Sequence, residues 1–154
     1  MHLHLIQFIT LLLLVLVTGV FWGPWLALHR SLHVFSKEEF LKITKTLGKN
    51  LGRPMQIMMP ICITMMGLSL LLFPDKRSTD FFLLAVSFSC LLLTLTVTLI
   101  TELPIVNKVR QWKVDCVPAN WESIRDKWVK FHTLRVFPAL LSLALYLAVV
   151  LDII

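Results

Sequence analysis

The stretch LIQFITLLLLVLVTGVFWGPW at residues 5–25 is the first of four long apolar segments that decide the fold. The other three are residues 55–73, 81–101 and 131–151. A helix needs roughly 20 apolar residues to cross a hydrocarbon core about 30 Å thick, and each segment meets that length. Backbone groups in lipid must be satisfied within one segment, and no alternating strand pattern is present, so helices are expected. The sequence therefore predicts an all-α integral membrane four-helix bundle.

The composition leads to the same class of protein. Of the 154 residues, 57% are hydrophobic and only 16% are charged, and the mean hydropathy is +0.80. A chain of this length folded in water does not bury so much apolar surface. No internal repeat or low-complexity linker divides the chain, so we expect a single transmembrane domain over residues 1–154.

Lys and Arg residues predict the orientation. The connection between the second and third segments carries only Lys76 and Arg77, and the two ends of the chain carry none. The other two connections hold six each, namely Arg30, Lys37, Lys42, Lys45, Lys49 and Arg53, and then Lys108, Arg110, Lys113, Arg125, Lys127 and Lys130. By the positive-inside rule, residues 29–54 and 102–130 are cytoplasmic and both termini lie outside. The expected location is the inner membrane of a bacterium. The first segment lacks a positively charged n-region, so we expect it to remain as a helix and not to be removed as a signal peptide.

The first basic connection contains a helix start signal. Ser36 with Glu39 three residues later is typical of a capping box, which opens a short helix whose Lys residues face lipid headgroups. We expect this interfacial helix to end near Gly48 or Gly52.

The second basic connection contains a helix breaker and a second start signal. Pro104 is expected to interrupt the helical run after Glu102. Asn120 is expected to cap a helix that begins at Trp121 and continues into the fourth segment.

One face of that last helix gathers aromatic and ionisable groups. Residues three and four apart share a helix face, which aligns Trp121, Arg125, Trp128, His132 and Arg135. An ionisable side chain at the membrane threshold is costly unless it meets a partner or a water-filled cavity. The face is therefore either a site or an interfacial belt in which Trp anchors and Arg reaches the phosphates.

Metal or haem ligation is a weaker alternative. His29 and His33 are spaced i, i+4, but no third ligand stands nearby, and interfacial His is the simpler interpretation. The three Cys residues show no metal-binding spacing and are expected to be unpaired. The second segment is rich in Met, which more often fills irregular packing than binds copper(I) or haem: Met55, Met58, Met59, Met65 and Met66.

The segment ELPIVNKVRQW at residues 102–112 leaves the third helix with a carboxylate, an amide and a guanidinium close together, those of Glu102, Asn107 and Arg110. Its alternative interpretation is an ordinary solvated helix end. All of these candidates belong to the cytoplasmic ends of their helices, where an aromatic-walled pocket can open. The residues expected to bind a ligand there are Trp22, Trp25, Glu102, Arg110, Trp112, Trp121 and Trp128.

Three motifs resemble the anthrone oxygenase-like family of small membrane proteins. They are GVFWGP at residues 19–24, the segment at residues 102–112, and the pattern W-x6-W-x3-H-x2-R from Trp121 to Arg135. Characterised members oxidise anthrones to anthraquinones without a metal or flavin. The resemblance implies an oxygenase with no cofactor that acts on a lipophilic aromatic, with His132 as base and with Arg135 and Asn107 stabilising the enolate oxygen.

Two other functions stay open at this point. The chain can be a non-catalytic membrane protein that binds a lipid, a quinone or a partner protein, or a haem or copper protein that uses His29, His33 or His132 with a Met. No P-loop, HExxH motif or nucleophile constellation appears in the sequence, and no nucleic-acid partner is expected. The expected partners are the lipid bilayer and a small lipophilic aromatic.

Overall fold

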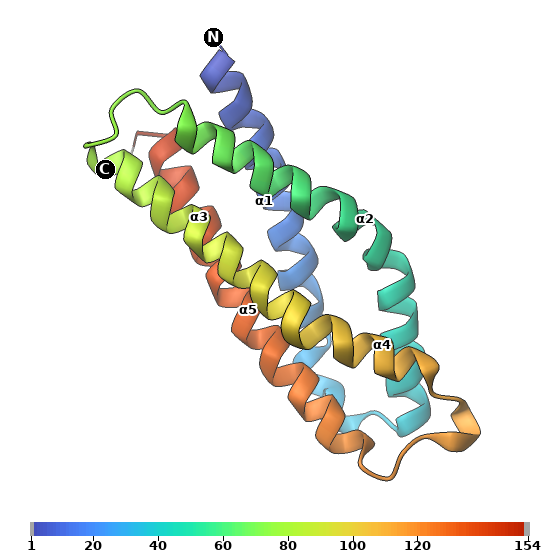
Figure 1. Ribbon diagram of the computed structural model, residues 1–154. Helices are drawn as coiled ribbons and strands as arrows, with labels where there is room; N and C mark the ends of the chain where they lie inside the picture. Colours follow the sequence, from blue (N-terminus) through green and yellow to red (C-terminus); the bar gives the residue numbers. More distant parts are fainter. Residues whose placement is uncertain (1, 153–154) are drawn as a thin grey trace.

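The computed structural model describes residues 2–152, except for the side chains of His2, His29, Arg30 and Asp115. Every regular element in that part of the chain is helical (Figure 1). In chain order they are α1 (His2–Ala27), the 3₁₀ turn η1 (His29–Val34), α2 (Lys37–Leu71), α3 (Thr79–Val97), the π-helical turn η2 (Thr98–Glu102), α4 (Leu103–Gln111), the 3₁₀ turn η3 (Val114–Cys116) and α5 (Trp121–Val150). Four helical runs are long and apolar enough to cross a membrane: Leu3–Ala27, Lys37–Leu71, Thr79–Gln111 and Trp121–Val150. The prediction of an all-α four-helix protein is therefore confirmed.

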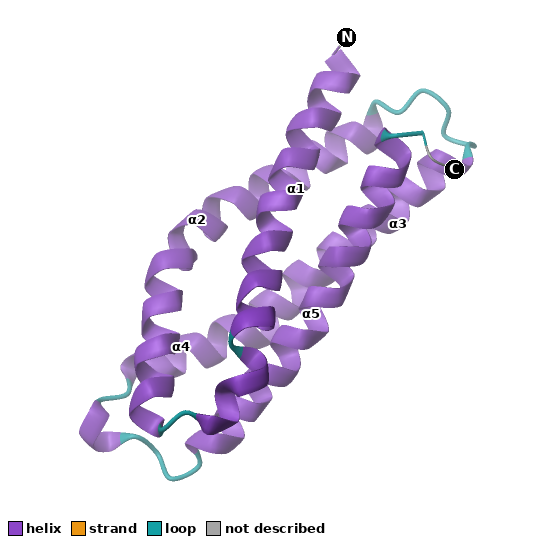
Figure 2. Ribbon diagram, turned by 180° about the vertical axis from the view of Figure 1, so that it is seen from behind, coloured by secondary structure: helices purple, strands orange, loops and turns teal. Residues whose placement is uncertain are grey.

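The four runs pack as an antiparallel bundle (Figures 1 and 2). Helix α1 contacts α2 and α5, and α3 contacts α5 and α2, so the helices close into a ring in the order α1, α2, α3, α5. The start of α1, the connection between α2 and α3, and the end of α5 lie at one end of the bundle. The opposite end carries η1, α4 and η3 and is called the basic end below.

The interior combines apolar side chains with hydroxyl groups that bond across helices. Leu14 and Tyr146 are completely buried, and the Tyr146 hydroxyl lies 3.1 Å from Ser69 Oγ. Ser87 donates to the backbone carbonyl of Ser142 at 2.6 Å. Such bonds tie transmembrane helices together because hydrocarbon offers polar groups no other partner. Many large apolar side chains on the outer faces are exposed and suited to lipid, among them Leu12, Phe82, Leu93 and Ile100.

Helix α2 begins as predicted but ends much later. Ser36 Oγ accepts from the Glu39 backbone N–H, and Glu39 Oε2 accepts from the Ser36 backbone N–H at 2.8 Å, so the capping box is confirmed. The predicted end near Gly48 or Gly52 is wrong, because α2 continues to Leu71. A glycine that stops a helix adopts a positive φ, and none of the glycines does so here. The interfacial helix and the second membrane span are therefore one element.

The third run also continues where a break was expected. Pro104 has no N–H to bond the carbonyl of Ile100, and a normal helical turn would push its ring against that carbonyl. The chain widens into the turn η2 just before Pro104, which avoids the clash and keeps the run helical. Thr98 and Thr101 donate to carbonyls one turn earlier, at 2.7 and 2.6 Å, within or next to this widened turn. The predicted interruption after Glu102 is therefore a π-helical turn in a continuous run.

Helix α5 agrees with its prediction except at its cap. It begins at Trp121 and runs through Pro138 to Val150 without a break. Asn120 stands at the N-cap position, but its side chain makes no capping hydrogen bond.

Candidate functional site

A cavity of about 390 Å³ lies between α2 and the α3–η2–α4 run. This volume falls within the range of small-molecule sites, roughly 300–1,000 Å³. Phe21 and Pro24 of α1, together with Trp128, His132 and Arg135 of α5, line its inner side. Its other walls are mainly apolar and include Leu47, Leu51, Met55, Met59, Leu95, Leu99, Leu103 and Val106. All four helical runs therefore contribute to one largely apolar cavity.

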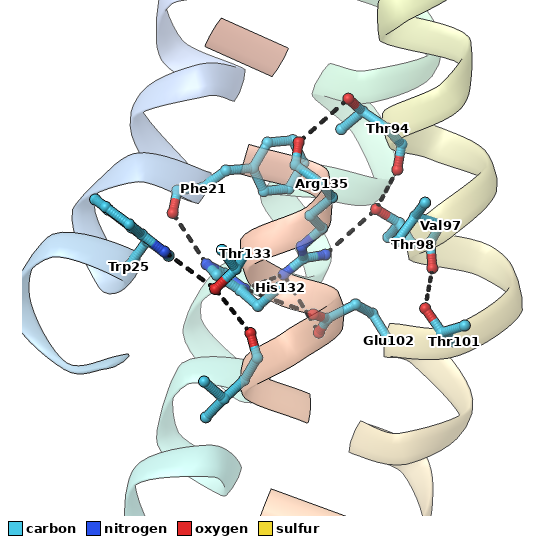
Figure 3. Close-up of polar contacts among 11 residues, drawn as sticks. Phe21, Trp25, Thr94, Val97, Thr98, Thr101, Glu102, His132, Thr133 and Arg135 are labelled. Carbon is cyan, nitrogen blue, oxygen red and sulfur yellow. Dashed lines mark hydrogen bonds and ion pairs between the residues drawn. The ribbon is translucent and has the colours of Figure 1, made fainter. Parts of the chain in front are cut away.

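Glu102, His132 and Arg135 form a polar cluster at the wall of this cavity (Figure 3). Arg135 Nη2 lies 3.4 Å from Glu102 Oε2, and His132 Nδ1 lies 3.7 Å from Glu102 Oε1. Glu102 and His132 are each only 2% exposed. The turn η2 carries Glu102, whereas α5 carries the other two on one face. A buried acid and a buried cation thus face each other across the contact between two helices.

Hydrogen bonds determine the tautomer of His132. Its Nε2 lies 3.0 Å from the carbonyl oxygen of Phe21, and because a carbonyl only accepts, Nε2 carries the proton. Its Nδ1 lies 2.8 Å from Arg135 Nη2, which only donates, so Nδ1 accepts. His132 is therefore a neutral imidazole with a hydrogen bond at each ring nitrogen, and it links Arg135 to the backbone of α1.

The Arg135 guanidinium has two further contacts. Its Nη1 donates to Thr98 Oγ1 at 3.3 Å, and its carbon lies 4.7 Å from the centre of the Phe21 ring. The cation is thus stabilised by a carboxylate, an imidazole, a hydroxyl and an aromatic face. These contacts hold the guanidinium in one position at the cavity wall.

Six of the residues predicted for the site line the cavity: Glu102, Asn107, Arg110, Trp128, His132 and Arg135. Asn107 and Arg110 are exposed and lie toward the basic end, one to two turns beyond Glu102. Arg110 crosses to α2, where it donates to the Gly48 carbonyl. The structure therefore brings together the stripe on α5 and the segment after α3, which are far apart in sequence.

Four predicted Trp residues do not line the cavity. Trp25 donates to Thr133 Oγ1 at 3.1 Å and stacks on Trp22 at a ring separation of 4.9 Å. Trp121 supports Arg125, whose guanidinium carbon lies 5.1 Å from its ring centre. Trp112 is buried in a separate apolar cluster at the basic end. These side chains pack helices together around the site.

Sequence reasoning missed two contributors. Thr98 stands one turn before Glu102, and that i, i+4 spacing was a usable signal for a shared face. The Phe21 carbonyl that accepts from His132 had no signal, because a backbone group takes part through tertiary contact alone.

No group of three or more His, Cys, Asp or Glu suited to a metal occurs among the residues that the structure describes. The side chain of His29, one member of the predicted His pair, lies outside the described residues.

Residues 50–145 match the sequence model of a family described as anthrone oxygenase. The matched interval covers more than half of the chain and includes Glu102, His132 and Arg135. Neither the curated proteins nor the solved structures contain a significant match.

Proposed function

Because the chain belongs to the anthrone oxygenase family, we propose that it is a membrane-embedded oxygenase that converts the activated methylene group of a lipophilic aromatic, such as an anthrone, into a carbonyl. The observation that carries this proposal is the buried cluster of Glu102, His132 and Arg135 on the wall of a largely apolar cavity. The apolar walls suit fused aromatic rings, and the cluster supplies both a proton acceptor and a cation.

The reaction needs a base and a group that stabilises an anion. The methylene C–H is acidic because its anion delocalises onto the carbonyl oxygen. The base takes one proton, the anion passes an electron to O₂, and the two radicals join in a C–O bond. The resulting peroxide anion recovers the proton. Removal of the second C–H proton then breaks the O–O bond, forms the carbonyl, and releases hydroxide that takes up this proton to become water. One oxygen atom enters the product and the other leaves as water.

The hydrogen bonds favour Glu102 over His132 as the base. His132 Nδ1 already accepts a hydrogen bond from Arg135, and Nε2 is protonated and donates to the Phe21 carbonyl, so neither ring nitrogen is available to take a proton. Glu102 also lines the cavity, and its carboxylate lies 3.4 Å from the Arg135 cation. In this assignment His132 is a positioning residue that orients Arg135. Arg135 stabilises the enolate oxygen, and Asn107 adds an amide donor closer to the rim.

The test is oxidation of an anthrone under air by the purified protein in lipid vesicles. Quinone absorbance and O₂ consumption are followed together, and one O₂ per quinone is expected. Glu102→Gln is expected to lower kcat by about 10²–10⁴, the usual contribution of a general base. The exposed Glu122→Gln, which removes a carboxylate from the same bundle, is the control and keeps the wild-type rate. Wild-type protein that is no faster than empty vesicles contradicts the proposed function. Equal rates for Glu102→Gln and wild type, with a loss in His132→Ala, transfer the role of base to His132.

We also infer that the basic end faces the cytoplasm. The support is the clustering of Lys and Arg in the connections at that end, according to the positive-inside rule. Labelling of a cysteine placed at Lys49 by a membrane-impermeant reagent tests this orientation. Protection in intact cells and reaction after permeabilisation are expected, and labelling in intact cells contradicts it.

A further inference from the structure

The cavity has a side that other helices do not cover. Leu99 of η2 and Leu103 of α4 line the cavity, yet they are 53% and 41% exposed. Across from them on α2, Gln56 and Pro60 also line it and are exposed. These residues belong to runs long and apolar enough to cross a membrane, so in a bilayer this side of the cavity opens toward lipid.

Contacts between α2 and the α3–η2–α4 run close both ends of this opening. Toward the basic end, Arg110 donates to the Gly48 carbonyl, and Lys45 Nζ donates to the carbonyl of Trp112 at 2.6 Å. Toward the opposite end, α2 contacts α3, and the Phe88 ring lies so near Gly67 that an added Cβ there would meet it at 3.9 Å. Helix α2 and the α3–η2–α4 run therefore contact each other on both sides of the cavity along the bundle axis, and a window remains between these two contacts.

The basic end holds a second barrier to water. A buried apolar cluster fills the bundle there, made of Leu32, Phe40, Leu41, Val109, Trp112 and Trp128. Trp128 belongs to this cluster and also lines the cavity, so the cluster adjoins the site on the side of the loops. A molecule arriving from the water at this end meets the exposed Asn107 and Arg110, the two cross-helix hydrogen bonds and this cluster.

From these observations we propose that the ligand enters sideways from the hydrocarbon phase of the bilayer, through a window framed by Gln56, Pro60, Leu99 and Leu103. This inference rests on the proposed function for the identity of the occupant, an uncharged fused-ring aromatic with one carbonyl or phenol group. Such a molecule partitions into lipid and meets mainly apolar side chains at the window, those of Pro60, Leu99 and Leu103. Its single polar end then reaches the ion pair of Glu102 and Arg135 on the inner wall of the cavity, and these two residues bind it. The ligand enters neutral, and its charge develops only inside the protein.

The window offers a matched pair of positions for a blocking experiment. Leu99 and Leu93 are 53% and 52% exposed on the same helical run, but only Leu99 lines the cavity. Each is replaced by Cys in a protein whose Cys90 and Cys116 are Ser, while the buried Cys62 is kept. A bulky non-fluorescent maleimide is then attached to protein that has already folded. The unmodified sample of each variant is its own control.

The measurement is the rate at which an anthraquinone, supplied within lipid vesicles, quenches protein Trp fluorescence. Modification of Leu99→Cys is expected to slow binding about tenfold or more, whereas modification of Leu93→Cys leaves the rate within about twofold. Lys45→Ala, which loosens the basic end, also leaves the rate unchanged. Equal rates before and after modification at position 99, or binding accelerated by Lys45→Ala, overturn the lateral route. Anthraquinone binding that is blocked at position 99 in a protein that oxidises no anthrone upholds the route and removes the proposed function. A wild-type protein that binds no anthraquinone removes both.

Discussion

Replacing Glu102 by Gln is expected to destabilise the folded protein, because it removes one charge of a buried ion pair while keeping the volume. The pair separation is 3.4 Å, and the two side chains are only 3% and 12% exposed. At that distance and an effective dielectric constant of about 20, Coulomb's law gives an attraction between the two charges of about 5 kcal/mol. Some of this attraction remains because the Gln amide oxygen carries a partial negative charge that faces the Arg135 cation. We expect a loss of about 3–5 kcal/mol, the range for a buried ion that loses its partner.

The assay is reversible unfolding in mixed micelles, followed by circular dichroism, for a double-mutant cycle. The cycle contains Glu102→Gln, Arg135→Gln and the double variant. If the pair produces the loss, the double variant is more stable than the sum of the single effects predicts, by about 2–3 kcal/mol. Glu38→Gln is the matched control, because Glu38 pairs with Lys37 at 3.7 Å but both side chains are about half exposed. Its expected cost is about 0–1 kcal/mol.

Two results refute this reasoning. One is a Glu102→Gln protein within about 0.5 kcal/mol of wild type, which is the scatter of ordinary surface substitutions. The other is a coupling energy near zero, which means that Glu102 and Arg135 act independently despite their distance.

Three further predictions use the same unfolding assay. Gly52→Ala is expected to stabilise α2 by about 0.5–1 kcal/mol, because its methyl group would lie at an ordinary 3.4 Å from Arg110 Nη2. Gly48→Ala is expected to stabilise less or to destabilise, because its methyl group would lie only 2.9 Å from the same atom. Equal gains contradict the close contact at Gly48. Tyr146→Phe removes the hydrogen bond to Ser69 and should cost about 0.5–1.5 kcal/mol; no change in stability argues against this bond. Ser36→Ala removes the capping box and should lower the stability by about 0.5–2 kcal/mol. Amide hydrogen exchange is expected to become faster in the first turn of α2 and to stay unchanged at the far end of the helix.

The predictions that held for the fold depend on local signals. Each of these signals lies within one continuous stretch of residues. They are the long apolar runs, the pairing of Ser36 with Glu39, and the start of α5 at Trp121. The wrong helix end at Gly48 shows the limit of such signals. A glycine in a helical pattern can either end the helix or allow another side chain to approach the backbone closely. At Gly48 the second role applies, and the approaching side chain is that of Arg110, 62 residues away in sequence.

The candidate site divides in the same way. His132 and Arg135 share a face because they stand three apart on one helix, and this spacing is visible in the sequence. Trp residues were assigned less well, because an indole ring suits an interface, a helix contact and a pocket equally. Trp128 lines the cavity, but Trp25 bonds to Thr133 and packs α1 against α5.

The sequence alone thus determined that the chain forms four helices long and apolar enough to cross a membrane and which end collects the polar groups, since hydropathy and charge are properties of each segment. Only the tertiary structure decided that Glu102 meets Arg135 and His132, and that a window remains between α2 and η2. The physical reason is that a contact between helices depends on the rotation and spacing of two separate elements. Those quantities are determined by packing across the whole bundle and not by any one stretch of residues.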